Sequence, residues 1–298
     1  MVFKMELDKI HIGGCLEIMK SFPSNSIDCI ITSPPYNKQN SVCHGYLKKK
    51  ISYAGNLDSV PEEQYQLQQI EFLDECHRVL KEDGSLFYNH KVRFFNGRAI
   101  HPMSWILKSR LNLRQEIIWN RKKALNISGI QFWSIDERIY WLNADNLKYK
   151  KLESRHALLK SVWDISPEQG SEHPAPFPLK IPTRILYSLY GDVAKGKIVL
   201  DPYCGSGTSL LAAKLLGHHY IGIENVPDYV NLSEDRVENS SEKDSLIIEE
   251  EKKLHIVAIP YSRRKETSKR YYEKCLMNSL KSEEFIKRGL CGQMKEKL

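Results

Sequence analysis

The sequence contains no run of 18 consecutive apolar residues, which excludes an ordinary membrane-spanning helix. Its seven cysteines are scattered, and no two of them form a Cys-x-x-Cys pair. An odd number of scattered cysteines argues against both a disulfide framework and a zinc site, so we expect no bound metal. The first residues also lack the apolar stretch of a secretory signal. Together these absences predict a cytoplasmic protein in a reducing setting.

Composition and charge describe a globular chain that could bind a polyanion. The 298 residues are 41% hydrophobic and 27% charged, and their number allows one large domain or two ordinary ones. The net charge is +7, and residues 101–160 alone carry 12 basic and 5 acidic side chains. Such a local excess is typical of a nucleic-acid footprint, although a solvated lysine-rich surface would give the same count.

Strand-like and helix-like segments alternate along most of the chain. Short apolar runs predict strands at 27–32, 85–88, 116–119, 138–142, 197–200 and 219–223. Helical spacing of apolar residues predicts a helix that begins at Pro61 and further helices at 101–111, 181–190 and 209–216. This alternation favours an α/β fold with a parallel sheet. Residues 143–176 are predicted to form a connection or small insert, and the charge-rich residues 240–298 an appendage outside the sheet.

A glycine-containing turn follows one of the predicted strands. Residues 201–208, Asp-Pro-Tyr-Cys-Gly-Ser-Gly-Thr, lie between that strand and a predicted helix. Gly205 and Gly207 would let the backbone approach a ligand closely. Glu224 ends the next strand, where a carboxylate can accept hydrogen bonds from a ribose diol. The unit therefore indicates a nucleoside site, although a tight turn without a ligand would use glycine in the same way.

The charge of this turn selects among nucleoside cofactors. A dinucleotide fingerprint requires a third glycine, and Leu210 occupies that position here. Asp201 would also repel a diphosphate. S-adenosylmethionine has no phosphate and carries a sulfonium and an ammonium group, so an acidic turn suits it better. We therefore predict S-adenosylmethionine as the cofactor.

The segment Thr-Ser-Pro-Pro-Tyr at 32–36 is the most specific stretch in the chain. Its two prolines fix the backbone and remove two N–H donors, which leaves carbonyl oxygens available just past a strand end. Ser33 adds a hydroxyl group and Tyr36 an aromatic face. Together they would offer acceptors to an amino group and a surface on which a planar ring can stack. The alternative is a rigid proline turn with Tyr36 packed on the core.

These segments resemble the motifs of DNA amino-methyltransferases. Residues 32–36 look like the catalytic motif of that family, whose general form is (Asp/Asn/Ser)-Pro-Pro-(Tyr/Phe/Trp), and residues 201–208 look like its cofactor motif. The stretch 173–178, His-Pro-Ala-Pro-Phe-Pro, resembles the third, cofactor-side motif. Their order, with the catalytic motif first, is that of the circularly permuted β subclass. The resemblance covers about residues 6–237.

The resemblance implies a fold, a domain organisation and partners. The fold would be Rossmann-like and typical of S-adenosylmethionine-dependent methyltransferases, with a mixed, mostly parallel seven-stranded sheet and helices on both faces. Residues 1–239 would form the catalytic domain, with a target-recognition insert at about 143–172, and residues 240–298 the appendage. The substrate would be double-stranded DNA, and a restriction endonuclease would be the functional partner of a monomeric or homodimeric enzyme.

The resemblance also implies roles for matching residues. Ser33 and the Pro34 carbonyl would accept hydrogen bonds from the target amine, Pro35 would stiffen the motif, and Tyr36 would stack on the flipped base. The cofactor pocket would comprise Asp201, Pro202, Tyr203, Cys204, Gly205, Ser206, Gly207, Thr208, Glu224, Asn225, Phe177 and Pro178. Phosphate contacts are expected from Arg121, Lys122, Lys123, Lys148, Lys150 and Lys151. One departure is Gly14, where members of the family often carry an aspartate.

The target base and the competing classes follow from the same residues. In the family, serine in the first motif position goes most often with cytosine N4, and aspartate or asparagine with adenine N6. The sequence therefore predicts site-specific methylation of cytosine N4 in duplex DNA by base flipping, with adenine N6 as the alternative. Methyltransferases acting on structured RNA or on protein glutamine generally place the glycine turn before the proline motif. A non-catalytic DNA-binding protein that keeps the fold is the alternative from another class.

Overall fold

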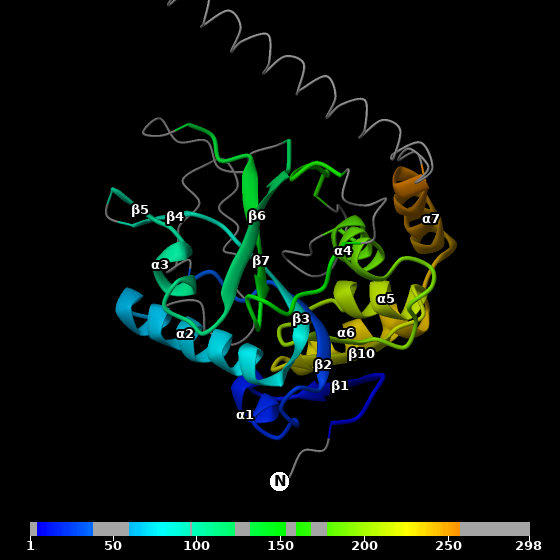
Figure 1. The fold of residues 1–298 in the computed structure, drawn as a ribbon, viewed down its shortest axis with the longest axis horizontal. Coiled ribbons are helices and arrows are strands. Elements are labelled where there is room, and N and C mark those ends of the chain that lie inside the picture. Colours follow the sequence, from blue (N-terminus) through cyan, green and yellow to red (C-terminus); the bar gives the residue numbers. More distant parts are fainter. Residues whose placement is uncertain are drawn as a thin grey trace, which may run out of the picture.

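The computed structural model describes residues 5–37, 60–95, 97–122, 132–152, 159–167 and 178–256 of the chain. Their core is an eight-stranded sheet with the order β1-β10-β9-β2-β3-β7-β6-β8 (Figure 1). The strands are β1 (Lys9–Ile12), β2 (Ile27–Thr32), β3 (Leu80–His90), β6 (Asn112–Asn120), β7 (Asp136–Asn143), β8 (Val162–Asp164), β9 (Ile198–Asp201) and β10 (His219–Glu224). Within this sheet β7 runs antiparallel to both its neighbours and the other strands are parallel to one another. The predicted α/β fold with a mostly parallel sheet is confirmed.

The sheet has one strand more than the seven that were predicted. The additional strand, β8, lies inside the predicted insert 143–172 and pairs with β6 at the sheet edge. It has three residues, too few for its alternation of exposed and buried positions to be visible in the sequence. Trp163, its central residue, is buried and fixes the strand in place.

Helices cover both faces of the sheet (Figure 1). They are α1 (Cys15–Met19), α2 (Glu62–Val79), α3 (Met103–Ile106), α4 (Lys180–Tyr190), α5 (Thr208–Leu215), α6 (Pro227–Glu238) and α7 (Glu242–Ile256). A short ribbon of β4 (Arg93–Phe95) and β5 (Arg98–Ile100) leads from β3 into α3. None of the helices in the described ranges is both long and apolar enough to cross a membrane.

Alternation along the central strands builds two hydrophobic cores. Cys29 and Ile31 of β2 pack with α4 and α5, whereas Ile30 packs with α1, α2 and α3 on the other face. Successive side chains of a strand point to opposite faces of the sheet. In a strand that is covered on both faces, both sets of side chains are therefore buried. All six residues of β2 are accordingly buried. This explains why four of its six positions, Ile27 and 29–31, are apolar.

The predicted helix over 101–111 is largely wrong. Only Met103–Ile106 is helical, and β6 begins at Asn112. Two serine hydroxyls donate to nearby carbonyl oxygens, Ser104 to His101 and Ser109 to Ile106, at 2.9 and 2.7 Å. Such local bonds compete with continuation of a helix.

The described part of the predicted appendage, α7, packs against α4 and lies outside the sheet. Arg184 of α4 donates two hydrogen bonds to Glu251 of α7, at 2.8 and 3.0 Å. The side chain of Glu251 is 2% exposed. Ile248 on the same helix joins the core above α4 and α5. The boundary at residue 239 stays a prediction.

Replacement of Glu251 by alanine should lower the free energy of unfolding by about 3 kcal/mol, because Arg184 is left buried without its partner. Glu249 provides the matched control, since it contacts Lys252 at 2.7 Å but is 58% exposed. Alanine at that position should cost less than about 1 kcal/mol. Urea denaturation followed by circular dichroism measures both variants, and equal losses would contradict a buried, stabilising pair.

Candidate active site

The two sequence motifs meet at one edge of the sheet. β2 and β9 are parallel neighbours, with Cys29 opposite Val199 and Ile30 opposite Leu200. Residues 33–36 leave β2 and residues 202–207 leave β9 at this common edge. The hydroxyl of Ser209, in the first turn of α5, lies 3.4 Å from the Ile31 carbonyl and links the two segments. The pairing of β2 with β9 therefore brings the two motifs together.

This edge is also the point at which the strand order reverses. From β2 the chain passes through α2 to β3 on one side, and from β9 it passes through α5 to β10 on the other. The two helices cover opposite faces of the sheet. In open α/β sheets, ligands bind in the crevice that such a reversal leaves outside the carboxyl ends of the strands.

The glycine turn after β9 requires glycine at Gly207. This residue has φ +74°, a left-handed conformation that side chains disfavour. A Cβ there would lie 2.9 Å from the Ser233 Cβ of α6. Gly205 also has a positive φ, of 50°. The close approach between the turn and α6 therefore depends on the missing side chain.

Asp201 is buried under this turn with a 1% exposed side chain. Burial raises the pKa of its carboxyl group from 3.8 to about 6, although the nearby hydroxyls of Ser209 and Thr32 and the amide of Tyr203 oppose the shift. The Tyr203 amide donates to the carboxylate at 3.2 Å. The site thus holds an acidic group that would gain from a nearby cation.

Glu224 is fixed at the end of β10 by backbone amides. Gly205 donates to one carboxylate oxygen at 3.0 Å, and Asn225 and Val226 donate to the other at 2.9 and 3.0 Å. Burial raises the pKa of Glu224, and these three bonds act against that shift. The carboxylate is therefore held in one orientation beside the glycine turn.

The remaining residues of the predicted cofactor pocket occupy different surroundings. Arg236 of α6 donates to the hydroxyls of Ser206 and Thr208 at 3.3 and 3.1 Å. The ring of Tyr203 packs edge-on against Phe72 of α2, 5.2 Å between centroids. Cys204 is buried, and burial raises the pKa of its thiol well above the usual range. Pro202 and Pro178 are buried, whereas Phe177 lies outside the described residues.

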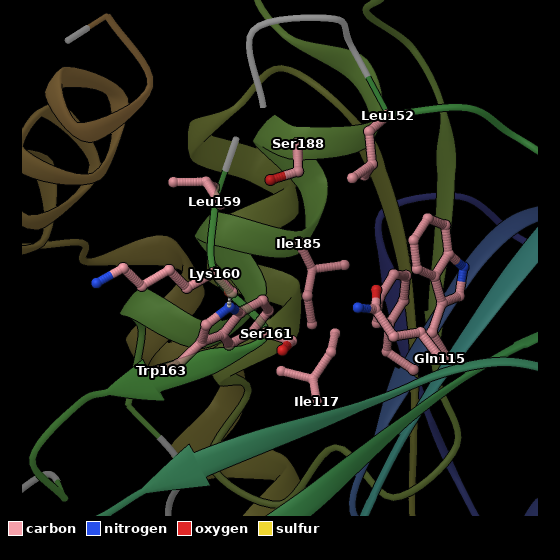
Figure 2. A pocket seen from close by; sticks show the side chains of 11 residues that line it. Gln115, Ile117, Leu152, Leu159, Lys160, Ser161, Trp163, Ile185 and Ser188 are labelled. Atoms are coloured by element: carbon pink, nitrogen blue, oxygen red, sulfur yellow. Dashed lines mark hydrogen bonds between the residues drawn. The ribbon is translucent and has the colours of Figure 1, made fainter. Parts of the chain in front are cut away.

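A second concave region lies on the α4 face, away from both motifs (Figure 2). In Figure 2 the side chains of Ile185 and Ser188 from α4 face those of Ile117 and Gln115 from β6. Its lining is mostly apolar and includes none of the predicted site residues.

Polar side chains from four strands converge on the proline motif. Each lies two residues before or after a core residue of the α4 face, which keeps it on the same face of its strand. The pairs are Ile31 and Ser33, Phe87 and Asn89, Trp119 and Arg121, and Ile139 and Glu137. The apolar rows of this face thus end in a polar cluster at the motif edge.

Tyr36 joins Ser33 to this cluster. Its hydroxyl lies 2.8 Å from the Ser33 hydroxyl and donates to Glu137 at 3.1 Å. The Asn89 amide nitrogen donates to the Tyr36 hydroxyl at 2.8 Å and to Glu137 at 3.1 Å. Arg121 donates to the other oxygen of Glu137 at 2.7 Å. Tyr36 itself is 8% exposed.

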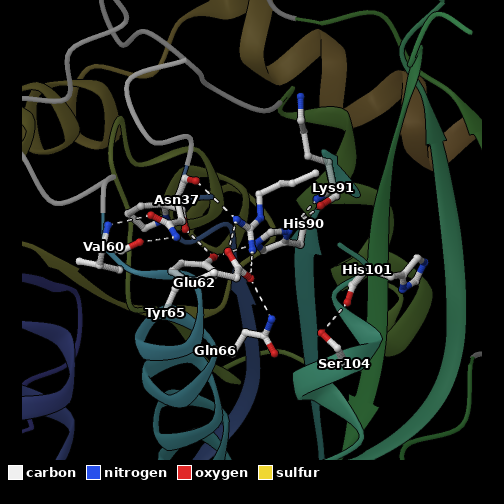
Figure 3. Close-up of polar contacts among 11 residues, drawn as sticks. Asn37, Val60, Glu62, Tyr65, Gln66, His90, Lys91, His101 and Ser104 are labelled. Atoms are coloured by element: carbon white, nitrogen blue, oxygen red, sulfur yellow. Dashed lines mark hydrogen bonds and ion pairs between the residues drawn. The ribbon is translucent and has the colours of Figure 1, made fainter. Parts of the chain in front are cut away.

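A second set of contacts holds the other side of the motif (Figure 3). Tyr65 of α2 donates from its hydroxyl to the Pro35 carbonyl at 2.8 Å. His90 lies 2.8 Å from the same hydroxyl, while the Lys91 amide donates to its Nδ1 at 2.9 Å. The same Nδ1 also lies 2.9 Å from the Lys91 carbonyl oxygen. Because Tyr65 donates its only hydroxyl proton to Pro35, Nε2 of His90 is assigned as the donor to Tyr65. The rings of His90 and Tyr36 are 4.5 Å apart.

The motif is closed off on its C-terminal side by Asn37. Its side chain both donates to the Val60 carbonyl at 3.0 Å and accepts from the Val60 amide at 2.9 Å. Arg93 beside it forms two 2.8 Å hydrogen bonds with Glu62 at the start of α2 (Figure 3). These contacts anchor the end of the motif to α2.

The predicted phosphate contacts are scattered. Arg121 is turned to Glu137 with a side chain that is 14% exposed, and Lys122 follows it at the sheet edge. The ammonium group of Lys148 pairs with Glu82 at 2.8 Å. The backbone amide of Lys150 donates a hydrogen bond to the carbonyl of Asp83. Glu82 and Asp83 lie near the start of β3, about 20 Å from its end at the motif edge.

That distance does not support phosphate contacts by Lys148, Lys150 and the exposed Lys151 next to the proline motif. Lys123 lies outside the described residues. The sequence reasoning missed Asn89 and Glu137. A sequence signal could have found them. In each strand, apolar residues alternate along one face, and a polar residue occupies the next position on that same face.

Replacement of Gly207 by alanine should lower the free energy of unfolding by about 1 to 3 kcal/mol more than the same change at Gly196. Both glycines have positive φ, 74° and 67°, so both variants carry backbone strain. A Cβ at Gly196 meets nothing within 4 Å, whereas one at Gly207 meets Ser233. Urea denaturation of the two variants measures the difference, and equal losses would show that α6 can move away.

Replacement of Asp201 by asparagine should raise stability at neutral pH. The native carboxyl keeps its proton up to about pH 6 and the unfolded one only to about pH 3.8, so native stability falls as pH rises through that window. The loss amounts to about 3 kcal/mol at pH 7. The free energy of unfolding of the variant minus that of the wild type should be near zero below about pH 4 and should grow as the pH rises. Urea denaturation at several pH values measures this difference. A difference that does not vary with pH would contradict the shift.

The chain matches the DNA methylase family over residues 27–235, a range that includes both motifs. It is 26% identical over 264 residues to the type II methyltransferase M.BglII of Bacillus subtilis, covering 77% of this chain and 69% of the relative. It is 28% identical over 255 residues to the type II methyltransferase M.HinfI of Haemophilus influenzae, covering 78% and 68%.

Solved structures share the fold. The PvuII DNA methyltransferase, described as cytosine-N4-specific, aligns with a TM-score of 0.64 at 21% identity, covering 85% of this chain and 95% of that one. The complex of M1.HpyAVI with S-adenosylmethionine aligns with a TM-score of 0.54 at 21% identity, covering 76% and 98%. Because the family match spans well over half of the sequence, this chain belongs to the DNA methylase family.

Proposed function

We propose that this chain transfers a methyl group from S-adenosylmethionine to the exocyclic N4 of cytosine in duplex DNA, at a specific site and on a flipped-out base. The observation that carries the proposal is the position of Ser33–Tyr36, which leave β2 beside the glycine turn of β9. Family membership supplies the reaction class. Serine at the first motif position favours cytosine over adenine.

The residues after β9 suit a cationic nucleoside cofactor. Asp201 is a buried acid whose pKa is raised by burial, so a sulfonium or ammonium group beside it would compensate its charge. Glu224, oriented by three amides, can still accept hydrogen bonds from ribose hydroxyls. Asn225, Phe177 and Pro178 complete the proposed pocket with the backbone of residues 202–208. When bound, S-adenosylmethionine supplies an electrophilic methyl group.

The proline motif orients the target amine. Tyr65 occupies the Pro35 carbonyl, which leaves Ser33 and the Pro34 carbonyl as the acceptors that we assign to the amine protons. Two hydrogen bonds from its protons would turn the nitrogen lone pair toward the methyl group, since the reacting atoms must be aligned at about 3–3.5 Å. The same acceptors stabilise the positive charge that develops on nitrogen. We assign base stacking to Tyr36.

The biological setting follows from the relatives. Both relatives named above are type II methyltransferases, which supports a role as the modification enzyme of a restriction-modification system. We propose residues 1–239 as the catalytic domain and 240–298 as an appendage docked through α7 on α4. Lys122, at the motif edge, and Lys123, the next residue in the sequence, are the basic residues that we assign to DNA phosphates.

The test is to incubate the purified protein with S-adenosylmethionine and duplex DNA of mixed sequence, digest the DNA and identify the methylated nucleoside by mass spectrometry. We expect N4-methylcytosine. Ser33→Ala serves as the control that assigns the product to this site, and it should lower the yield at least 100-fold.

If the product is N6-methyladenine, the proposed methyl transfer stands, but the conclusion that Ser33 selects cytosine is overturned. Bound cofactor without any methylated nucleoside, in a pool that contains all eight-base sequences, would favour the non-catalytic alternative.

A further inference from the structure

A buried carboxylate closes a chain of hydroxyl groups behind the proline motif. The chain runs from the Ser33 hydroxyl to the Tyr36 hydroxyl and on to Glu137, with separations of 2.8 and 3.1 Å. The side chain of Glu137 is 10% exposed. A proline turn can be supported without a carboxylate, and burying one costs free energy unless it is paired. We therefore expect the Glu137 carboxylate to have a function in the reaction.

The neighbours of Glu137 fix the direction of each proton. Arg121 donates to one carboxylate oxygen. The amide nitrogen of Asn89 donates to the Tyr36 hydroxyl and to the other carboxylate oxygen, and it also lies 3.4 Å from the Ser33 oxygen. Tyr36 then donates its proton to Glu137, and the Ser33 proton points to Tyr36. Of the two lone pairs of the serine oxygen, one faces Asn89 and the other is presented to the space beyond the motif.

We infer that Glu137 is the final acceptor of the proton released by the target amine, which reaches it through Ser33 and Tyr36. This inference rests on the proposed function and adds to it the route of the proton. Asn89 and Arg121 are positioning residues, because they act through Tyr36 and Glu137 and not on the base.

The step balances without any further reactant. Methyl transfer leaves the amine nitrogen with a positive charge and one proton too many. One N–H bond breaks and its proton binds the Ser33 oxygen as the Ser33 proton moves to Tyr36 and the Tyr36 proton to Glu137. The products are the neutral methylated amine and a protonated carboxyl group, which returns its proton to solvent after product release. Before that, the same chain stabilises the growing charge on nitrogen, so its loss slows the chemical step.

Charged and polar groups surround Glu137 on several sides. Arg121 from β6 contacts it, Asn89 from β3 is neutral, and Tyr36 carries the proton. On β7 itself Arg138 and Asp136 pair with each other, and Arg138 also contacts Glu116, on the opposite face of the strand. His90 faces the Tyr36 ring.

The test is the single-turnover rate of methyl transfer to DNA by the full-length chain. Glu137→Gln should lower this rate about 100-fold, while the affinities for S-adenosylmethionine and DNA stay within about threefold. Tyr36→Phe keeps the ring and breaks the chain, so it should lower the rate to a similar degree. The double variant should be no slower than the slower single variant, because both changes interrupt one route.

Glu251→Gln is the matched control, since it also neutralises a buried carboxylate paired with arginine but lies on α7. It should leave the rate unchanged. Activity of Glu137→Gln within threefold of wild type, or fully multiplicative effects in the double variant, would overturn the inference alone. Absence of methyl transfer by the wild-type protein would overturn the proposed function, and the inference with it.

Discussion

Parallel pairing between β2 and β9 is the contact on which the arrangement of the site depends. It brings Thr32 and Asp201, 169 residues apart in sequence, to one edge of the sheet. A slip of one residue would exchange Ile30 with its neighbours between the two cores, because successive side chains face opposite sides. Packing on both faces therefore fixes the register, and with it the spacing between the proline motif and the glycine turn.

The proline motif is held from two sides by polar contacts. Glu137, Asn89 and Arg121 surround Tyr36, while Tyr65 and His90 hold the Pro35 carbonyl. A buried ion pair adds little to stability relative to well-packed apolar residues, although removing one partner alone is costly. The contacts do fix orientation, because the Tyr36 hydroxyl and the Glu137 carboxylate are each held by more than one partner. The stiffness that proline gives the backbone is thus extended to the side chains of the motif.

Sequence alone predicted the alternation of strands and helices, the two motifs and the family. These features depend on local patterns, such as the apolar run of β2 and the glycines after β9. The three residues of β8 carried no such pattern. Glu137 was missed because its partners, Tyr36 and Asn89, come from strands distant in sequence. For the same reason Arg121 was assigned to DNA, although its guanidinium group is turned to Glu137.

The paired hydrogen bonds between Asn37 and Val60 have a consequence for how such a chain can change over time. They hold Asn37 and Val60, 23 residues apart in the sequence, against each other, so the end of the motif is anchored on α2 by contacts within the described residues. Doubling the length of a closed loop costs only about 0.6 kcal/mol. Added residues between Asn37 and Val60 would therefore cost little entropy as long as these two hydrogen bonds are kept.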